Sequence, residues 1–452
     1  MVLRTARVGL RLTRAQRRRC FGLLLAAGDL WSCVLDMNRW RRQRGSAPMV
    51  NFQELCRELH AAGPGTFGEL DSKGAEGVLR RFSDAWFSAA KRRKGGDMTA
   101  RFPRRKRRFL PVRLRYGGFA LEGRRLRLAV GRGRPPLWVR LDRDLPYPPG
   151  QVRAVTLLAD GGRVWVDVTA EVPVTLYPAG AGPDPSRVAG VDPGIIHPYA
   201  VAGPGPEGLL VSGRAIRAEH HLHHHDTKHR RRAVAHRAPT PGQRGSRRLK
   251  KYGARQRNFE AQPKRRIRQA EHEAARTLVD WAIQHRIGTL KVGDPRGVVK
   301  LKAGRRHNRR VNDWRIGRRL RILGDKAEQA GIAVELVDER GTSSTCPNLE
   351  CRRRVPKPRG RGLSCPHCGF HGHRDLVGAA NIAIKNGGGH IIVPHGAKIT
   401  HRRAGKHLPG VNPARRDPRR GPHRGIARGS PGEQSPAPDR HSGESLASAR
   451  NP

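Results

Sequence analysis

Two close pairs of cysteines, followed at once by an acidic residue, constrain this chain more than any other feature. Cys346 and Cys351 enclose four residues, and Cys365 and Cys368 enclose two. Cysteine pairs at such spacings, placed on two opposing turns, supply four thiolates to one tetrahedral zinc ion. Four thiolates leave no open position for a catalytic water, so the spacing predicts a structural zinc ribbon. Asp375 follows the last cysteine by seven residues and brings a carboxylate next to this ribbon.

The charge of the chain indicates a polyanionic partner. Its 452 residues include 91 Lys and Arg against 37 Asp and Glu, which gives a net charge of +54. Such a charge repels itself unless a polyanion neutralises it, and nucleic acid binds basic proteins through counterion release. A genomic bias toward Arg explains why Arg outnumbers Lys, but it does not explain the shortage of acidic residues. The composition therefore predicts a nucleic-acid-binding protein.

The cysteine count and the absence of apolar segments indicate a reducing compartment. There are seven cysteines, an odd number, and the first residues, MVLRTARVGLRLTRAQRRR, lack the apolar core of a secretory signal. No stretch approaches the ~18 uncharged apolar residues that a transmembrane helix needs. We therefore expect a cytoplasmic protein with neither a membrane partner nor a small-molecule substrate.

The order of apolar patterns in the first part of the chain predicts a β-rich unit. Within residues 1–175, a strand precedes helices in the region 13–92, where Thr13 and Gln16 have the spacing of a capping box. A run of alternating, strand-like segments follows. This order fits a small β-barrel with a helical insertion, and a linker containing Pro and Gly covers residues 176–187.

The second part of the chain is predicted to be α/β. In residues 188–340 strands alternate with helices, one of which is expected from Pro263 to Arg286 with its apolar residues on one face. The zinc ribbon occupies residues 341–372, and a short helical segment follows in 373–388. Gly, Pro, Arg, His and Ser dominate residues 389–452, which predicts a basic, disordered tail.

Two aspartates are candidates for a metal site. Asp192 ends an apolar strand in the segment VAGVDPGIIHPYAVA, and Asp375 precedes a short helix. Each has an ordinary structural explanation by itself, because Asp-Pro-Gly is common in turns and Asp is common at the start of a helix. A two-metal nuclease needs several carboxylates that converge from different strands and helices. The pair therefore carries more weight than either residue alone.

These segments resemble TnpB (OrfB-type), the family of RNA-guided, transposase-associated nucleases of bacterial insertion sequences, which is related to type V CRISPR effectors. The resemblance covers most of residues 75–386. Besides the Asp192 segment it rests on LKVGDPRGV, HNRRVNDWRIGRRLRILGDKAEQAGI, DERGTSSTCP and CPHCGFHGHRDLVGAANIAI. It implies a RuvC-like nuclease domain of RNase H fold with an inserted zinc ribbon. A β-barrel wedge domain with a helical recognition insertion would precede it.

The resemblance also implies an activity, partners and cofactors. The protein would be a transposon-encoded, RNA-guided DNA endonuclease associated with the bacterial nucleoid. It would bind a guide RNA and a target DNA with a short adjacent motif, and base pairing would read the sequence. Structural Zn²⁺ would bind at the four cysteines. Two catalytic Mg²⁺ ions would bind at Asp192, Asp375 and a third acid.

The third acid is where this chain departs from the family. The family commonly has a Glu at the end of the strand written here as LKVGDPRG, where this chain has Gly293 followed by Asp294. Some members carry the acid just before the ribbon instead, and Glu339 fits that place. Glu339 is the predicted ligand because it follows a strand and is long enough to bridge metals; Asp294 and Asp338 are weaker candidates. The alternative is that no acid replaces the lost Glu, leaving a nuclease-inactive, RNA-guided DNA-binding protein or repressor.

The histidine run from His220 to His225 and the basic segment 228–265 have more than one interpretation. The histidines could bind a metal adventitiously, but we interpret them as part of a solvated helix that faces RNA. The basic segment is interpreted as a surface that contacts phosphates rather than one that reads sequence.

Overall fold

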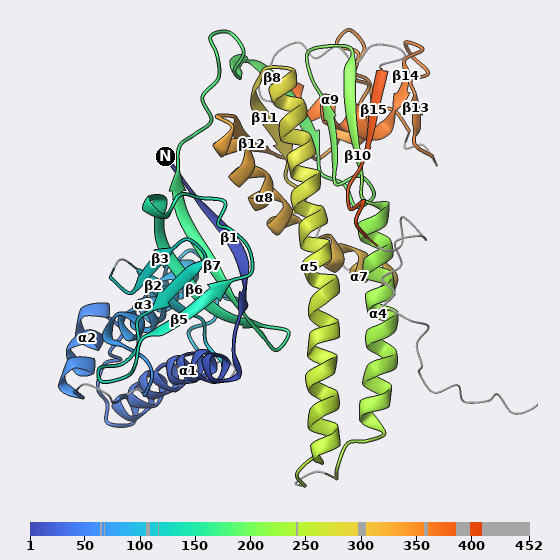
Figure 1. Ribbon diagram of the computed structural model, residues 1–452. Helices are drawn as coiled ribbons and strands as arrows, with labels where there is room; N and C mark the ends of the chain where they lie inside the picture. Colours follow the sequence, from blue (N-terminus) through green and yellow to red (C-terminus); the bar gives the residue numbers. More distant parts are fainter. Residues whose placement is uncertain are drawn as a thin grey trace, which may run out of the picture.

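In the computed structural model the chain forms two units, each built on its own sheet (Figure 1). The N-terminal unit has a seven-stranded antiparallel sheet, and the second unit has a six-stranded mixed sheet. The structure describes residues 1–63, 66, 68–104, 109–115, 117–240, 243–296, 304–356, 360–385 and 398–408.

The N-terminal sheet has the order β2-β6-β7-β1-β5-β4-β3 and nearly closes into a barrel. The first strand joins its two halves, because Val2 to Gly9 pair with β7 whereas Leu10 and Arg11 pair with β5. Alternating residues of the long strands are buried, as expected for a sheet with one face on a core. The strands are β1 (Val2–Arg11), β2 (Val112–Arg115), β3 (Phe119–Glu122), β4 (Arg125–Leu128), β5 (Leu137–Leu141), β6 (Val152–Asp160) and β7 (Arg163–Val172).

Helices are inserted between β1 and β2, as the sequence predicted. The capping box is present, because the Thr13 side chain accepts from the Gln16 backbone and the Gln16 side chain accepts from the Thr13 backbone. By length and composition α1 is apolar enough to cross a membrane, but core helices of folded domains pass the same test. Its Trp31 is buried against Phe82 of α3, with ring centroids 5.0 Å apart. The helices are α1 (Arg14–Gln43), α2 (Phe52–Ala61) and α3 (Ser72–Lys94).

The second sheet has the order β12-β11-β8-β9-β10-β15. β8, β9 and β10 form an antiparallel meander, while β11 and β12 run parallel to β8. β8 begins at Asp184, so it starts inside the expected linker 176–187. The strands are β8 (Asp184–Asp192), β9 (Tyr199–Ala202), β10 (Glu207–Ser212), β11 (Ile287–Gly293), β12 (Ala333–Val337) and β15 (Lys398–Arg403).

Helices cover both faces of this sheet (Figure 1). On one face Ala189 and Val191 of β8 pack into the core that includes α5 and α8. On the other face α9 lies against β8, β9 and β11. The helices are α4 (Arg214–Ala235), α5 (Arg247–Gln284), α7 (Arg305–Trp314), α8 (Ile316–Gln329) and α9 (Arg374–Ile384).

The helix that we expected to begin at Pro263 begins sixteen residues earlier. α5 starts at Arg247, where Ser246 caps it by accepting from the Leu249 backbone, and it continues through Pro263. A proline inside a helix removes one backbone hydrogen bond. Here Pro263 is itself buried, and α5 packs along α4, so tertiary contacts outweigh that loss. Most of the basic segment 228–265 therefore belongs to the α4–α5 helix pair.

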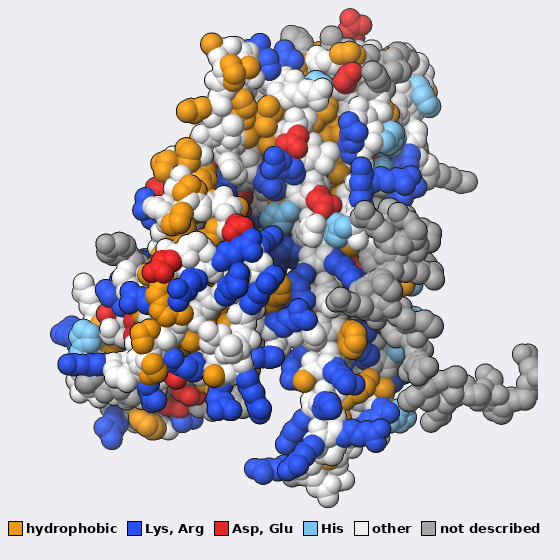
Figure 2. All heavy atoms as spheres, viewed as in Figure 1, with side chains coloured by type: hydrophobic (Ala, Val, Ile, Leu, Met, Phe, Trp, Pro, Cys, Tyr) orange, Lys and Arg blue, Asp and Glu red, His pale blue; other side chains and the backbone are white. Residues whose placement is uncertain are grey.

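The two units meet along α5 and α8. Arg265 of α5 pairs with Asp160 at 3.4 Å, and its guanidinium carbon lies 5.2 Å from the ring centroid of Trp165. Arg4 of β1 donates to Gln329 at the end of α8. Below these contacts, Figure 2 shows a hollow between the N-terminal unit and the α4–α5 pair, with Lys and Arg side chains on both sides.

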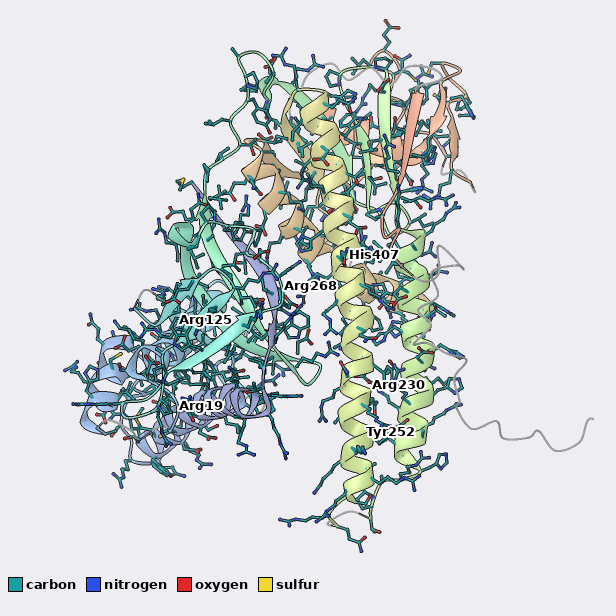
Figure 3. All side chains as sticks on the ribbon, viewed as in Figure 1. Arg19, Arg125, Arg230, Tyr252, Arg268 and His407 are labelled. Carbon is teal, nitrogen blue, oxygen red and sulfur yellow. The ribbon has the colours of Figure 1, made fainter. Side chains whose placement is uncertain are left out.

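The expectation of a disordered tail from residue 389 onward is wrong for residues 398–408. β15 adds to the sheet by pairing in parallel with β10, and the following residues Ala404 and Leu408 are buried against α5. His407, labelled in Figure 3, lies with Nε2 3.1 Å from the Arg266 carbonyl oxygen and Nδ1 3.0 Å from a carboxylate oxygen of Glu273. Composition missed this strand because few apolar residues are needed to complete a sheet edge. Residues 389–397 and 409–452 lie outside the described residues.

Candidate functional site

Three acidic residues from separate elements line one cleft at an edge of the second sheet. Asp192 is the last residue of β8, Glu339 is the second residue after β12, and Asp375 is the second residue of α9. β8, β11 and β12 are parallel, so their carboxyl ends meet at the same edge. The cleft has a volume of about 550 Å³, and all three carboxylates line it. The sequence had predicted these three residues, and the structure brings them together.

The alternation of β8 explains why Asp192 faces α9. Ala189 and Val191 pack on the face covered by α5, so the residues between and after them point to the opposite face. Gly378 on α9 permits a close approach there, because a Cβ at this glycine would lie 2.8 Å from Oδ2 of Asp192. The same face therefore carries Asp192 and the N-terminus of α9 with Asp375.

Glu339 fills the space in front of Gly293. A Cβ placed on Gly293 would lie 3.0 Å from Oε2 of Glu339 and 3.3 Å from its Cβ. Gly293 ends β11, between β8 and β12 in the sheet. The Glu339 carboxylate thus reaches the position at which a side chain from residue 293 would enter the cleft.

The two other acids considered near this position are turned toward arginines of their own loops. Asp294 accepts from Nε of Arg296 at 2.7 Å, and this interaction lowers the pKa of Asp294. The Asp338 side chain is 57% exposed and lies 3.7 Å from Nε of Arg340. Neither residue belongs to the lining of the acidic cleft. Among the acids weighed, the geometry favours Glu339.

Two of the three carboxylates in the cleft have raised pKa values. Burial raises the pKa of Asp192 to about 7, with further contributions from the charges of Asp375 and Glu339. Burial also raises the pKa of Glu339 to about 7, and the charges of Asp294 and Asp338 add to this shift. A buried set of like charges is unfavourable without a cation, so the cleft is suited to hold one.

Asp375 is held by a histidine and an arginine that the sequence analysis did not single out. His197 Nδ1 donates to Oδ2 of Asp375 at 2.7 Å, and Arg361 Nη1 lies 2.7 and 2.9 Å from its two carboxylate oxygens. Burial raises the pKa of Asp375, but the His197 hydrogen bond and the Arg361 charge outweigh burial, so its pKa is lowered. In the sequence, only the position of His197, five residues after Asp192 in the same turn, could have indicated that it belongs to the site. No feature of the sequence indicated a role for Arg361.

Asp375 also belongs to a tighter group of potential metal ligands. Its carboxylate and the rings of His197 and His373 offer atoms that all lie within 4.8 Å of one another. Asp192 and Glu339 line the same cleft but are not members of this group. Both the three carboxylates of the cleft and this group of Asp375 with two histidines offer oxygen or nitrogen atoms that can coordinate divalent cations.

The four predicted cysteines converge beside the cleft. Their sulfurs all lie within 4.8 Å of one another, with Cys346–Cys368 at 3.5 Å and Cys351–Cys365 at 3.7 Å. Zinc–sulfur bonds of ~2.3 Å in a tetrahedron place sulfurs ~3.8 Å apart, so these residues could hold zinc. A hairpin of β13 (Gly362–Ser364) and β14 (His371–His373) carries the second pair.

The cysteine cluster is attached directly to the acidic cleft. Arg361, which binds Asp375, immediately precedes β13, and β14 leads without a break into α9. On the other side, Asn381 of α9 donates to the carbonyls of Thr342 and Thr345, just before Cys346. The ribbon therefore determines where Asp375 and Arg361 lie.

Basic residues surround the cleft and extend along the α4–α5 pair. Arg361 and Arg374 line the acidic cleft, and a neighbouring pocket that shares Asp192 and Asp375 also contains Arg217 and Arg310. Figure 3 places Arg268 on α5 between that helix and the N-terminal unit, and Arg230 and Tyr252 farther along the pair. At the far end a basic pocket is lined by Arg237, Arg248, Lys251, Tyr252 and Arg255.

Comparisons with known proteins connect this site to a family. Residues 317–382, from α8 through the cysteine cluster to α9, match the Cas12f1-like TNB domain family. A search of the curated proteins found no match. The structure is similar to one described as the Cas12f1–sgRNA–target DNA complex, with a TM-score of 0.57 and 15% sequence identity. The match covers 82% of this chain and 83% of that chain.

A second solved structure, described as the mini-RNA-guided endonuclease CRISPR-Cas_phi3, has 11% identity over 84% of this chain and 92% of that chain, with a TM-score of 0.46. At these identities the Cas12f1 comparison establishes the fold, while the family match identifies the region of the ribbon and α9. These findings support the resemblance of the segments around Asp192 and the cysteines to TnpB and the related Cas12 effectors.

Proposed function

We propose that the protein is an RNA-guided DNA endonuclease whose catalytic acids are Asp192, Glu339 and Asp375. One observation carries the proposal: carboxylates from β8, the β12 loop and α9 line a single cleft beside the cysteine cluster. A purely structural role does not explain why two of them are held in an environment that raises the pKa of each to about 7. Such shifts are typical of functional sites.

The donor set fits magnesium. Mg²⁺ prefers carboxylate oxygens, and a cation would offset the repulsion among the three acids. When bound, a pair of Mg²⁺ ions supplies an activated water and stabilises the leaving 3′ oxygen. The residues of the chain would hold the ions, with His197 and Arg361 fixing the orientation of Asp375. Arg374 and Arg217 provide positive charge for a phosphate backbone at the same place.

The fold supports a RuvC-like domain of the RNase H type in residues 184–408. In chain order, the antiparallel strands β8, β9 and β10 are followed by β11 and β12, which run parallel to β8. In the sheet these five strands lie in the order β10-β9-β8-β11-β12. The acids lie at the carboxyl edge of this sheet, where ligands of open α/β sheets bind. In this proposal the N-terminal near-barrel is the wedge domain, and α1–α3 form the recognition part.

The proposed partners are a guide RNA and a target DNA with a short adjacent motif. The similar Cas12f1 structure is described as a complex with sgRNA and target DNA. The basic side chains on both sides of the hollow in Figure 2 provide a surface on which a duplex backbone is neutralised. The transposon origin, the bacterial cytoplasm and the nucleoid association belong to the proposal through the family resemblance alone.

The test is a cleavage assay on the protein purified with the RNA that accompanies it. Sequencing that RNA defines the target, and Mg²⁺-dependent cutting of matching DNA is then measured for the wild type and for Asp192→Ala. We expect cleavage to be lost in the variant while RNA binding persists. Asp184→Ala is a matched control, because Asp184 starts the same strand at its opposite end. Cutting by Asp192→Ala at the wild-type rate would contradict the assignment.

A nuclease-inactive DNA-binding protein is the second candidate, favoured by the glycine at position 293, where the family commonly has an acid. This candidate predicts guide-dependent DNA binding but no cutting with Mg²⁺ or Mn²⁺. The position of Glu339 in front of Gly293 argues against it. The same wild-type assay separates the two candidates.

A further inference from the structure

A second cluster of potential metal ligands lies between α4 and the end of α7. His220 and His224 are one helical turn apart on α4, and Asp313 is the penultimate residue of α7. His224 Nε2 lies 2.9 and 3.0 Å from the two carboxylate oxygens of Asp313, and His220 Nδ1 lies 3.6 Å from the nearer one. The candidate ligand atoms of the three residues all lie within 4.8 Å of one another.

The burial of His220 contradicts our interpretation of the histidine run as a solvated surface. The side chain of His220 is only 7% exposed. Its Nδ1 is beyond hydrogen-bond distance of Asp313, and its Nε2 has no partner among the described residues. A buried imidazole with no hydrogen bond to the described residues is unfavourable, and an ion shared with Asp313 would give Nδ1 a partner.

We propose that His220, His224 and Asp313 bind one Zn²⁺ ion that fastens α7 to α4. Zinc commonly takes two imidazole nitrogens and a carboxylate oxygen, with water as the fourth ligand. Residues four apart on a helix lie on the same face, which is how one helix supplies two of the three ligands. Bond lengths of ~2.0–2.1 Å in a tetrahedron separate the ligand atoms by ~3.3–3.4 Å. The observed separations of 2.9 and 3.6 Å bracket that value.

The proposed zinc site lies next to a residue that lines the acidic cleft. Trp314 follows Asp313 and lines the acidic cleft with Asp192 and Glu339. Arg315 then adopts a left-handed conformation with φ of 47°, which separates α7 from α8. An ion at Asp313 would therefore hold the end of α7, and with it one wall of the cleft, against α4. The inference stands whether or not the cleft cuts DNA.

The test measures metal content and cobalt spectra of the full chain without an affinity tag. After equilibration with Zn²⁺ and removal of free ion, we expect a second equivalent of zinc beyond the one held by the cysteines. Asp313→Asn and His224→Gln should each lose that equivalent. In the Co²⁺ form these variants should lose only the weaker d–d bands, while the thiolate charge-transfer bands persist and show that the fold and the cysteine site remain.

Two controls come from the same helix. His221→Ala removes an exposed neighbour and should keep both equivalents. His225 and His229 form another pair, with Nε2 atoms 3.3 Å apart, so His229→Ala tests whether that pair binds the ion instead. The proposal is overturned if the wild type binds only the cysteine-held zinc. It is also overturned if His229→Ala loses the second equivalent while His224→Gln keeps it.

Discussion

Glu339 Oε2 lies 3.0 Å from the position that a Cβ on Gly293 would occupy. Gly293 ends β11, and Glu339 follows β12, the neighbouring parallel strand. A side chain from either position can therefore reach the same part of the cleft. A carboxylate that could have come from the end of β11 comes from the loop after β12. This relationship is the physical basis for assigning Glu339 as the third acid.

Replacing Glu339 with Gln should abolish most cleavage. Gln keeps the size of the side chain but removes the charge that would hold a divalent cation. We expect the cleavage rate to fall at least about 100-fold, which corresponds to ~2.7 kcal/mol. Asp338→Asn is the matched control, because it removes an exposed carboxylate one residue away and should leave the rate within about twofold. Equal losses in both variants, or a loss in neither, would remove Glu339 from the site.

A compensating change should restore part of the activity. In the double variant Gly293→Glu with Glu339→Gln, the carboxylate returns to the cleft from β11. A Cβ at residue 293 would lie 2.9 Å from Cδ1 of Ile382, the end of a flexible side chain, so a modest adjustment is required. We expect cleavage well above that of Glu339→Gln alone. A double variant with wild-type thermal stability but no recovered cleavage would argue that the two positions are not equivalent.

The raised pKa of Asp192 makes a prediction about stability in the absence of Mg²⁺. An acid whose folded pKa is about 7, against an unfolded value of ~3.9, contributes stability at low pH that is lost as pH rises toward and through 7. Asp192→Asn lacks this penalty, so its Tm should exceed that of the wild type at pH 8. The gain should be ~2–4 °C for each kcal/mol of relief. Thermal unfolding in Mg²⁺-free buffer without chelator measures it; an equal Tm at pH 8 would show that the carboxylate is not destabilised there.

Magnesium binding should be pH-dependent for the same reason. Asp192 and Glu339 must both lose protons to bind a cation, and each has a pKa of about 7 without one. Affinity should therefore rise from pH 6 to pH 8, with proton release on binding. Titration calorimetry in buffers of different ionisation enthalpy measures both quantities. Affinity that is constant across this range would show that these two acids do not titrate with the metal.

Removal of Cys365, one of the four proposed zinc ligands, should impair the acidic cleft. Loss of the ion would release the β13–β14 hairpin, which carries Arg361 against Asp375. We expect Cys365→Ser to lose one zinc equivalent and most of the cleavage activity, because structural zinc contributes directly to folding. Cys33→Ser is the control, since that cysteine is exposed and outside the cluster. Full activity without the cysteine-held zinc would separate the ribbon from the site.

Local patterns in the sequence predicted those parts of the molecule that depend on local chemistry. The Thr13–Gln16 capping box and the four converging cysteines were confirmed, because both depend on short spacings. Asp192 and Asp375 were predicted as site residues from segments that resemble TnpB, and the structure places both in one cleft. The contacts of His197 and Arg361 could not be predicted, because they depend on how a turn and the ribbon meet in space.

Other differences arose where tertiary packing outweighed local preference. Pro263 indicated a helix start, yet α5 runs through it because the helix packs along α4. β15 was overlooked because its partner, β10, lies almost two hundred residues earlier in the chain. His220 was assigned to a solvated face, but its side chain is buried.

The most direct test of the proposed function is Mg²⁺-dependent cutting of DNA by the protein purified with its own RNA. The target should match the sequence of that RNA, and the wild type should be compared with Asp192→Ala. We predict that the wild type cuts this DNA, and that Asp192→Ala binds the same RNA and DNA without cutting. Guide-dependent binding by the wild type with no cleavage under any divalent metal, or cleavage by Asp192→Ala, would contradict it.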